Sequence, residues 1–172
     1  MTERPDCIRH WSEVEEPSEG HYDGDDEVMG YGAPLARHFG LTRLGIHHLR
    51  LPPGRRSSFP HAESMEEEFV YVLEGTPDVW LDGRLHRLAP GDSVGFPAGT
   101  GIAHTFINNS QQEVHLLVAG ETRRSDNRIV YPKNPERKAL REDWWEDAPE
   151  RPLGPHDGVP DALRARKDQQ ER

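Results

Sequence analysis

The sequence predicts an all-β domain, an antiparallel sandwich or barrel, with a loosely packed extension at each end. Turn-forming residues are abundant, with 16 glycines and 15 prolines among 172 residues, and hydrophobic residues make up only 33% of the chain. Apolar residues are concentrated in the middle, where short β-prone segments follow one another without helical segments between them. This length is typical of one domain with extensions.

Residues 1–40 are expected to form an N-terminal arm and a short helix. The acidic run EVEEPSEGHYDGDDE has few apolar anchors, which predicts a loop or an arm that becomes ordered only against another surface. The segment APLARHFG then has a short helical pattern, because Leu35 and Phe39 are four residues apart and Gly40 is a natural stop. We expect this helix to cover one end of the β core.

Residues 41–120 carry the predicted strands. The segment from Leu41 to Leu51 alternates as a strand does, but its pattern leaves open which face is inward, so either His47 or His48 is expected to face the core. Further along, Asp82-Gly83 is typical of a two-residue hairpin turn. The strands expected after Leu51, each about five or six residues long, lie in EFVYVLEG, PDVWLDG, RLHRLAPGD, SVGFPAG, IAHTFIN and EVHLLVAG.

Residues 121–172 are rich in charge and proline and are expected to form a C-terminal extension. This extension is predicted to pack across the β domain or against a partner subunit, with a short polar helix or disorder from Asp161 onward. Its expected apolar anchors are Ile129, Val130, Tyr131, Trp144, Trp145 and Leu153.

Composition also limits the partners. The formal net charge of -10 disfavours nucleic acid and anionic lipid, because both bind to positive surfaces. No apolar run approaches the roughly 18 residues of a membrane span, and the single cysteine, Cys7, cannot form an internal disulfide. We therefore expect a soluble cytoplasmic protein. A small-molecule ligand and a homodimer are expected separately, from the functional hypotheses given below.

Four residues in the middle of the chain suggest a metal site. His61 and Glu63 are two residues apart, so in a strand their side chains share one face. Glu68 begins the next predicted strand, and His104 comes from a distant one. Carboxylates inside a barrel need a cation, because an isolated buried charge is costly, and two imidazoles with two carboxylates suit a divalent transition metal.

The same residues belong to two spaced motifs. In the first, Gly54 is followed by His61, Glu63, Glu68 and Gly75; the second consists of Gly91, Pro97, Gly99, His104 and Asn108. Together they resemble the two conserved motifs of the cupin superfamily. The first motif of that family usually has a second histidine where Glu63 stands, and the second has two fewer residues before its histidine. The segment from Asp126 to Pro132 is also similar to small bacterial cupins, some described as proposed sugar-phosphate isomerases.

The resemblance implies a small cupin-type jelly-roll β-barrel with one divalent metal ion inside, which would be Zn, Fe, Mn, Ni or Cu. Carried over residue by residue, the implied metal ligands are His61, Glu63, Glu68 and His104. Glu63 is either a ligand or a free general base beside a site with three ligands. A third reading is that the site has been lost and that His61 lies on a surface loop.

Other residues are assigned to the substrate pocket. Phe106 shares a strand face with His104 and is expected to form an apolar wall, His48 is expected to line the same cavity, and Tyr131 is expected to close its mouth. The family resemblance implies a metalloenzyme of the isomerase, lyase or dioxygenase type that acts on a sugar derivative or small acid. The alternatives are a non-enzymatic sensor or ligand-binding cupin, and a purely structural role in a homodimer.

Overall fold

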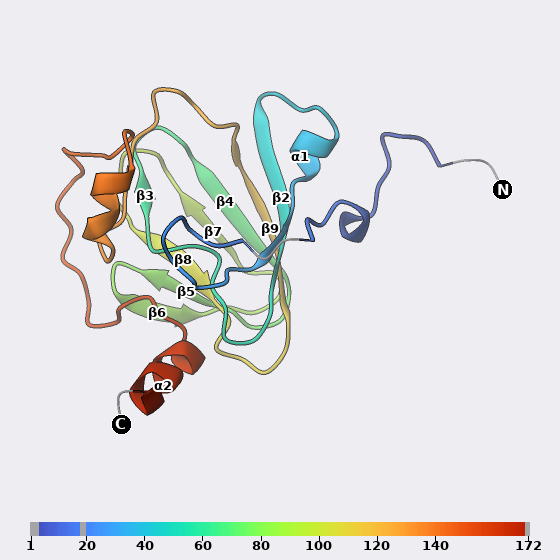
Figure 1. The fold of residues 1–172 in the computed structure, drawn as a ribbon. Helices are drawn as coiled ribbons and strands as arrows, with labels where there is room; N and C mark the ends of the chain where they lie inside the picture. The colour runs from blue at the N-terminus through green and yellow to red at the C-terminus, as the bar shows by residue number, and fades with distance from the viewer. Residues whose placement is uncertain (1–3, 18–19, 171–172) are drawn as a thin grey trace.

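The fold is a two-layered arrangement of antiparallel strands (Figure 1). The structure, a computed structural model, describes residues 4–17 and 20–170. A five-stranded sheet has the order β1-β2-β9-β4-β7, a three-stranded sheet has the order β6-β5-β8, and β10 pairs with β3. The strand bounds are Tyr31–Ala33 (β1), Leu44–Leu51 (β2), Ala62–Glu63 (β3), Glu68–Glu74 (β4), Asp78–Leu81 (β5), Arg84–Arg87 (β6), Ser93–Phe96 (β7), His104–Ile107 (β8), Val114–Glu121 (β9) and Ile129–Val130 (β10).

The main core lies between the two larger sheets. Along β4, Val70 and Val72 are buried while Phe69, Tyr71 and Leu73 on the other face are exposed, which is the alternation of a strand with one face on a core. Burying a side chain of this size contributes about 1.5–3 kcal/mol relative to leaving it in water. The core cluster combines side chains of both sheets, namely Leu51, Val70, Val72, Val79, Phe96, Phe106, Val114 and Leu116.

The strand pairing confirms the all-β prediction. β2 pairs with β9 along its whole length, so the beginning and the end of the domain lie side by side, as expected of a jelly roll. The β5–β6 hairpin turns at Asp82 and Gly83, which have φ angles of 44° and 88°. Positive φ at both central residues is what a type I′ turn requires, so this predicted turn is confirmed.

Helices are few and short. They are η1 (Trp11–Glu13), α1 (Leu35–His38), η2 (Pro135–Leu140) and α2 (Asp161–Gln170). α1 lies in the predicted helical segment, is followed by Gly40 with φ of 67°, and contacts β2. α2 begins at the expected Asp161. Within the described ranges, none of these helices is long and apolar enough to cross a membrane.

The N-terminal arm is ordered against the β domain. The Tyr22 ring stacks on Phe59 with 4.4 Å between ring centroids, and Trp11 stacks on His48 at 4.1 Å. Met29, at the end of the arm, is buried in the same cluster as Phe59. The surface against which the acidic arm orders is therefore the chain's own β domain.

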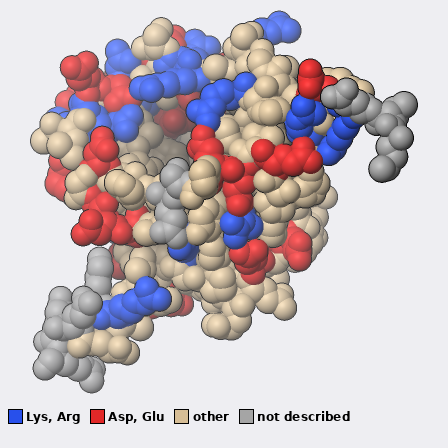
Figure 2. Space-filling view, turned by 45° about the vertical axis from the view of Figure 1, so that its right-hand side comes forward, with Lys and Arg blue, Asp and Glu red and all other residues tan. Residues whose placement is uncertain are grey.

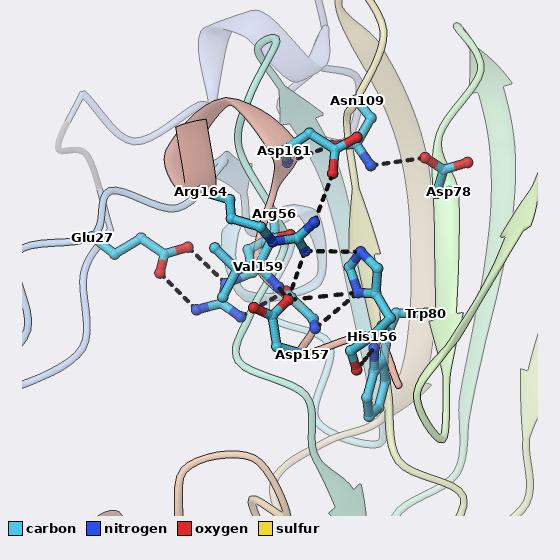
Figure 3. A network of polar contacts seen from close by, with 11 residues as sticks. Glu27, Arg56, Asp78, Trp80, Asn109, His156, Asp157, Val159, Asp161 and Arg164 are labelled. Atoms are coloured by element: carbon cyan, nitrogen blue, oxygen red, sulfur yellow. Dashed lines mark hydrogen bonds and ion pairs between the residues drawn. The ribbon is translucent and has the colours of Figure 1, made fainter. Parts of the chain in front are cut away.

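The C-terminal extension is fastened by a polar network (Figure 3). The Arg56 guanidinium, only 3% exposed, pairs with Glu27 of the arm through two 2.6 Å hydrogen bonds and donates to the Gly158 carbonyl. The Trp80 indole donates to the His156 carbonyl at 3.0 Å. This network joins the arm, the β domain and the extension.

Most of the expected apolar anchors of the extension are confirmed. Ile129, Tyr131 and Trp145 are buried, whereas Leu153 is 38% exposed and therefore does not anchor the extension on the β domain. Leu153 lies in a proline- and glycine-rich stretch that the adjoining Gly154 holds through backbone contact with the Asp82-Gly83 turn. Backbone contact therefore fixes the chain at this point.

Figure 2 shows basic side chains gathered toward the upper left of that view, although the chain is acidic overall.

Candidate functional site

A cavity of about 180 Å³ opens between the two sheets and contains most of the predicted site. The chain segment before β3 runs antiparallel to β8, where His61 and His104 exchange backbone hydrogen bonds of 3.1 and 2.9 Å. This pairing places their imidazole rings 4.8 Å apart. The inner cavity is lined by Gly32, His47, Leu49, Ser57, Ser58, His61, Glu68, His104, Phe106 and Val118.

The two imidazoles are held in the same tautomer. His61 Nδ1 lies 2.9 Å from the Phe59 carbonyl oxygen, and His104 Nδ1 lies 3.2 Å from that of Ile102. A carbonyl oxygen only accepts hydrogen bonds, so each Nδ1 carries a proton, and in the neutral ring the lone pair is on Nε2. Such backbone contacts orient histidine ligands in metal sites.

Burial keeps His61 neutral. Desolvation, helped by the neighbouring His104, lowers the pKa of His61 to about 4, although Glu68 opposes this shift. The His104 ring is fixed by Phe96, which stacks on it with 3.5 Å between ring centroids and 9° between planes. At neutral pH the inner cavity therefore holds an uncharged His61 imidazole beside a His104 ring of fixed orientation.

Glu68 supplies the negative charge. Its Oε1 lies 3.3 Å from His104 Nε2. Burial alone would raise the pKa of the Glu68 carboxyl, but the contact with the His104 side chain holds that pKa below its usual value. Glu68 is therefore a carboxylate at neutral pH.

The side chains of the inner cavity are of the chemical types that bind a divalent transition metal. His104 Nε2 is buried, and the 3.3 Å contact with Glu68 lacks hydrogen-bond geometry, so Nε2 has no hydrogen-bond partner among the described residues. Imidazole nitrogens and a carboxylate are ligands that such metals accept. In the part of the chain that the structure describes, however, no three His, Cys, Asp or Glu side chains stand in an arrangement that could hold a metal ion as it is.

Glu63 lies apart from the inner cavity. It lines a second, polar cavity of about 320 Å³, together with Arg123, Arg124 and Arg141. A narrow gap lined by Glu63, Glu68 and His104 lies between the two cavities. Burial, with the Glu66 and Glu68 carboxylates, raises the pKa of Glu63 to about 7. The structure thus brings His61, Glu68 and His104 together and places Glu63 beside them.

The three residues assigned to the substrate pocket have different positions. Phe106 lines the inner cavity as expected. His48 does not, and this expectation needs correction: Leu49 and Leu51 face inward, so His47 shares their face while His48 faces outward against Trp11. Tyr131 packs behind His61, with 5.9 Å between ring centroids, and does not line the cavity.

Three polar residues of the cavity are not among the predicted site residues. The sequence offers His47 only as an alternative to His48, because both faces of its strand carry apolar residues. Ser57 and Ser58 were not considered, although a hydroxyl pair just before His61 in the first motif was a usable signal. In the structure the Ser57 hydroxyl lies 3.2 Å from Thr105 Oγ1, and the Ser58 hydroxyl lies 3.3 Å from His61 Nδ1.

The central region of the chain matches a known protein family. The family model of the cupin domain matches residues 47–120. No curated protein matches the sequence. Among solved structures, the chain is similar to the polyketide cyclase RemF from Streptomyces resistomycificus, with 22% identity, a TM-score of 0.58, and coverage of 84% of this chain and 96% of that one. At this identity the similarity shows the fold alone.

Two further structures are more similar in sequence. A proposed sugar phosphate isomerase from Acidithiobacillus ferrooxidans is 33% identical with a TM-score of 0.58, over 61% of this chain and 66% of that one. A sugar phosphate isomerase of the cupin superfamily from Silicibacter pomeroyi is 34% identical with a TM-score of 0.57, over 59% and 64%. The chain thus spans slightly less than two thirds of either relative.

Proposed function

Because the chain belongs to the cupin superfamily, with its cupin domain at residues 47–120, we propose that it is a metal-dependent enzyme that binds a small polar molecule in the inner cavity. The observation that carries this proposal is the pair of histidines whose Nδ1 atoms are held by backbone carbonyls, next to the Glu68 carboxylate. Cupins commonly bind a metal. A metal ion would be held by His61, Glu68 and His104.

A bound divalent ion would polarise a carbonyl or hydroxyl oxygen of the substrate. The chain's own side chains would do the rest. Phe106, Leu49 and Val118 form an apolar wall that limits water, and the Ser57 and Ser58 hydroxyls offer hydrogen bonds to substrate hydroxyl groups. These features favour a sugar derivative or a small acid, and isomerase, lyase and dioxygenase reactions are all compatible with them.

We assign proton transfer to Glu63. Its carboxyl lines the narrow gap beside Glu68 and His104, where it can exchange a proton with a molecule at the metal or with the outer polar cavity. A role as the fourth ligand would require Glu63 to turn into the inner cavity. The names of the two isomerase relatives support a sugar derivative as the substrate. The homodimer expected from the sequence stays a prediction.

Cobalt titration tests the metal proposal directly. Co²⁺ bound by nitrogen and oxygen ligands absorbs visible light, so binding is measured without an assay of activity. We expect His104→Ala to weaken Co²⁺ binding at least tenfold, because it removes the buried Nε2 donor, while the exposed His86→Ala leaves it unchanged. Equal binding by both variants would place the metal elsewhere.

A second function is a non-enzymatic cupin that binds a small ligand without metal. It is favoured by the absence, among the described residues, of three donors in an arrangement that could already hold a metal ion. In this case the Glu68 carboxylate and the two imidazoles would hydrogen-bond a polar ligand directly. Binding of a sugar or small acid by metal-free protein, with no gain on adding metal, would identify this function.

A further inference from the structure

The polar cavity on the far side of Glu63 enters the function proposed above only through proton exchange with Glu63. We call it the outer cavity. Its volume of about 320 Å³ is at the lower end of the range for small-molecule pockets, which is roughly 300–1,000 Å³. It is formed where the chain after β9 passes over β3 and meets the segment that follows η2. Its lining residues are Glu63, Glu66, Arg123, Arg124, Ser125, Asn127, Ile129, Arg141 and Asp143.

Two of its three arginines are already engaged. Arg141 makes two hydrogen bonds to Asp143, of 2.8 and 2.7 Å, and a third to the Tyr131 hydroxyl. Arg124 is paired with Asp126 at 2.9 Å and with Glu121 at 3.3 Å. Their charges are largely neutralised by these carboxylates.

Arg123 is different. Among the described residues it forms no hydrogen bond and no ion pair, although its charge helps to lower the pKa of the Asp143 carboxyl. The cavity therefore has one guanidinium whose five N–H donors are uncommitted.

Among the described residues, no acidic side chain of the cavity is paired with Arg123. Asp143 is held by Arg141, and Glu66 accepts a hydrogen bond from the backbone N–H of Arg124. Glu63 is hydrogen-bonded by the Asn127 side chain. Among the described residues, Arg123 is thus the one arginine of the cavity that is paired with no carboxylate.

From this arrangement we infer that the outer cavity binds the oxyanion of a small molecule, a phosphate or a carboxylate, with the Arg123 guanidinium as its anchor. A guanidinium binds both groups through paired, charge-assisted hydrogen bonds. The Ser125 hydroxyl lies on the same cavity wall as a further donor. This inference does not depend on a metal in the inner cavity.

The chain provides a matched control. Arg128 is on the same loop and is also exposed, but it donates to the Asn127 carbonyl and does not line the outer cavity. Arg123→Gln and Arg128→Gln change the net charge equally. A difference in anion affinity between the two variants therefore reflects binding in the outer cavity and not the change in net charge.

The test is an NMR titration of metal-free protein with inorganic phosphate and, separately, with L-malate, following the backbone amides of residues 123–127. We expect saturable binding of at least one anion, weakened tenfold or more by Arg123→Gln and changed less than twofold by Arg128→Gln. The anion that binds more tightly identifies the group. Absence of saturable binding of both anions, or equal weakening by the two variants, would overturn the inference.

The outcome is separable from the proposed metal site. Arg123→Gln should leave Co²⁺ binding within twofold of the unmodified chain, because Arg123 lines only the outer cavity. Likewise His104→Ala should leave anion binding unchanged. Failure of the anion test with intact Co²⁺ binding removes only the outer site, and the reverse result removes only the metal site.

Discussion

Position 63 decides how the inner cavity works. The chain carries a carboxylate where the resembled motif has a second histidine, and in the structure Glu63 lines both the narrow gap beside Glu68 and the outer cavity. Burial beside two other carboxylates makes a charged Glu63 unfavourable unless a cation or a hydrogen-bond donor is near. This position suits a group that gains and loses a proton better than one permanently bound to a metal.

We therefore predict that Glu63→Gln retains metal and loses turnover. Glutamine preserves the size of the side chain but cannot accept a proton, and general-base catalysis typically contributes about 10²–10⁴-fold in rate. Co²⁺ affinity should stay within threefold, while the turnover found in a screen of sugars and small acids should fall about 100-fold or more. Parallel loss of metal and turnover would instead make Glu63 a ligand.

His48 predicts how stability depends on pH. Burial, together with the neighbouring His115, lowers its pKa to about 4 from an ordinary value of 6.5. Between these values the unfolded chain binds a proton that the folded chain does not, so His48 makes the folded state lose stability as pH falls from about 6.5 toward 4.

The corresponding variant is His48→Gln. The denaturant midpoint of the unmodified chain should fall between pH 7 and pH 5, and the fall should be smaller in His48→Gln because one titrating group has been removed. The exposed His86→Gln is the control and should reproduce the original slope. Identical slopes in all three proteins would contradict a neutral, buried His48.

Among the secondary-structure elements, the extensions are as important as the strands. The arm and the C-terminal extension meet at Arg56, in the loop between β2 and β3. The guanidinium is 3% exposed and the paired Glu27 side chain 11% exposed, so water cannot replace either partner. Removing one member of such a pair leaves a buried charge without compensation.

Glu27→Gln should therefore lower the free energy of unfolding by about 3 kcal/mol, the lower part of the range for breaking a buried ion pair. Urea denaturation measures it. Lys138→Gln, which breaks the exposed pair with Glu146, should cost less than about 1 kcal/mol. Comparable losses in the two variants would show that the Arg56 pair is solvated and does not fasten the extensions.

The β elements were predictable because their signals are local. Alternation in EFVYVLEG and the Asp82-Gly83 pair each follow from neighbouring residues, and both were confirmed. The orientation of β2 was not predictable, because apolar residues on both of its faces make the pattern symmetric. Only pairing with β9 decides that His47 faces inward.

At the scale of the molecule, the motif spacing along the chain identified the residues of the inner cavity but not the outer cavity beside it. The two motifs brought His61, Glu68 and His104 to one cavity as expected. The outer cavity escaped prediction because Arg123 and Arg141 come from an extension whose path depends on tertiary contacts, such as the bridge between Ile129 and Trp144.

We propose that the inner cavity is a metal centre. Elemental analysis of the protein, purified without a histidine tag, tests it most directly by counting bound Zn, Fe, Mn, Ni and Cu per chain. We predict about one metal ion per chain, lost in His61→Ala and in His104→Ala and retained in His86→Ala. A stoichiometry near zero, or one that His61→Ala leaves unchanged, would contradict it.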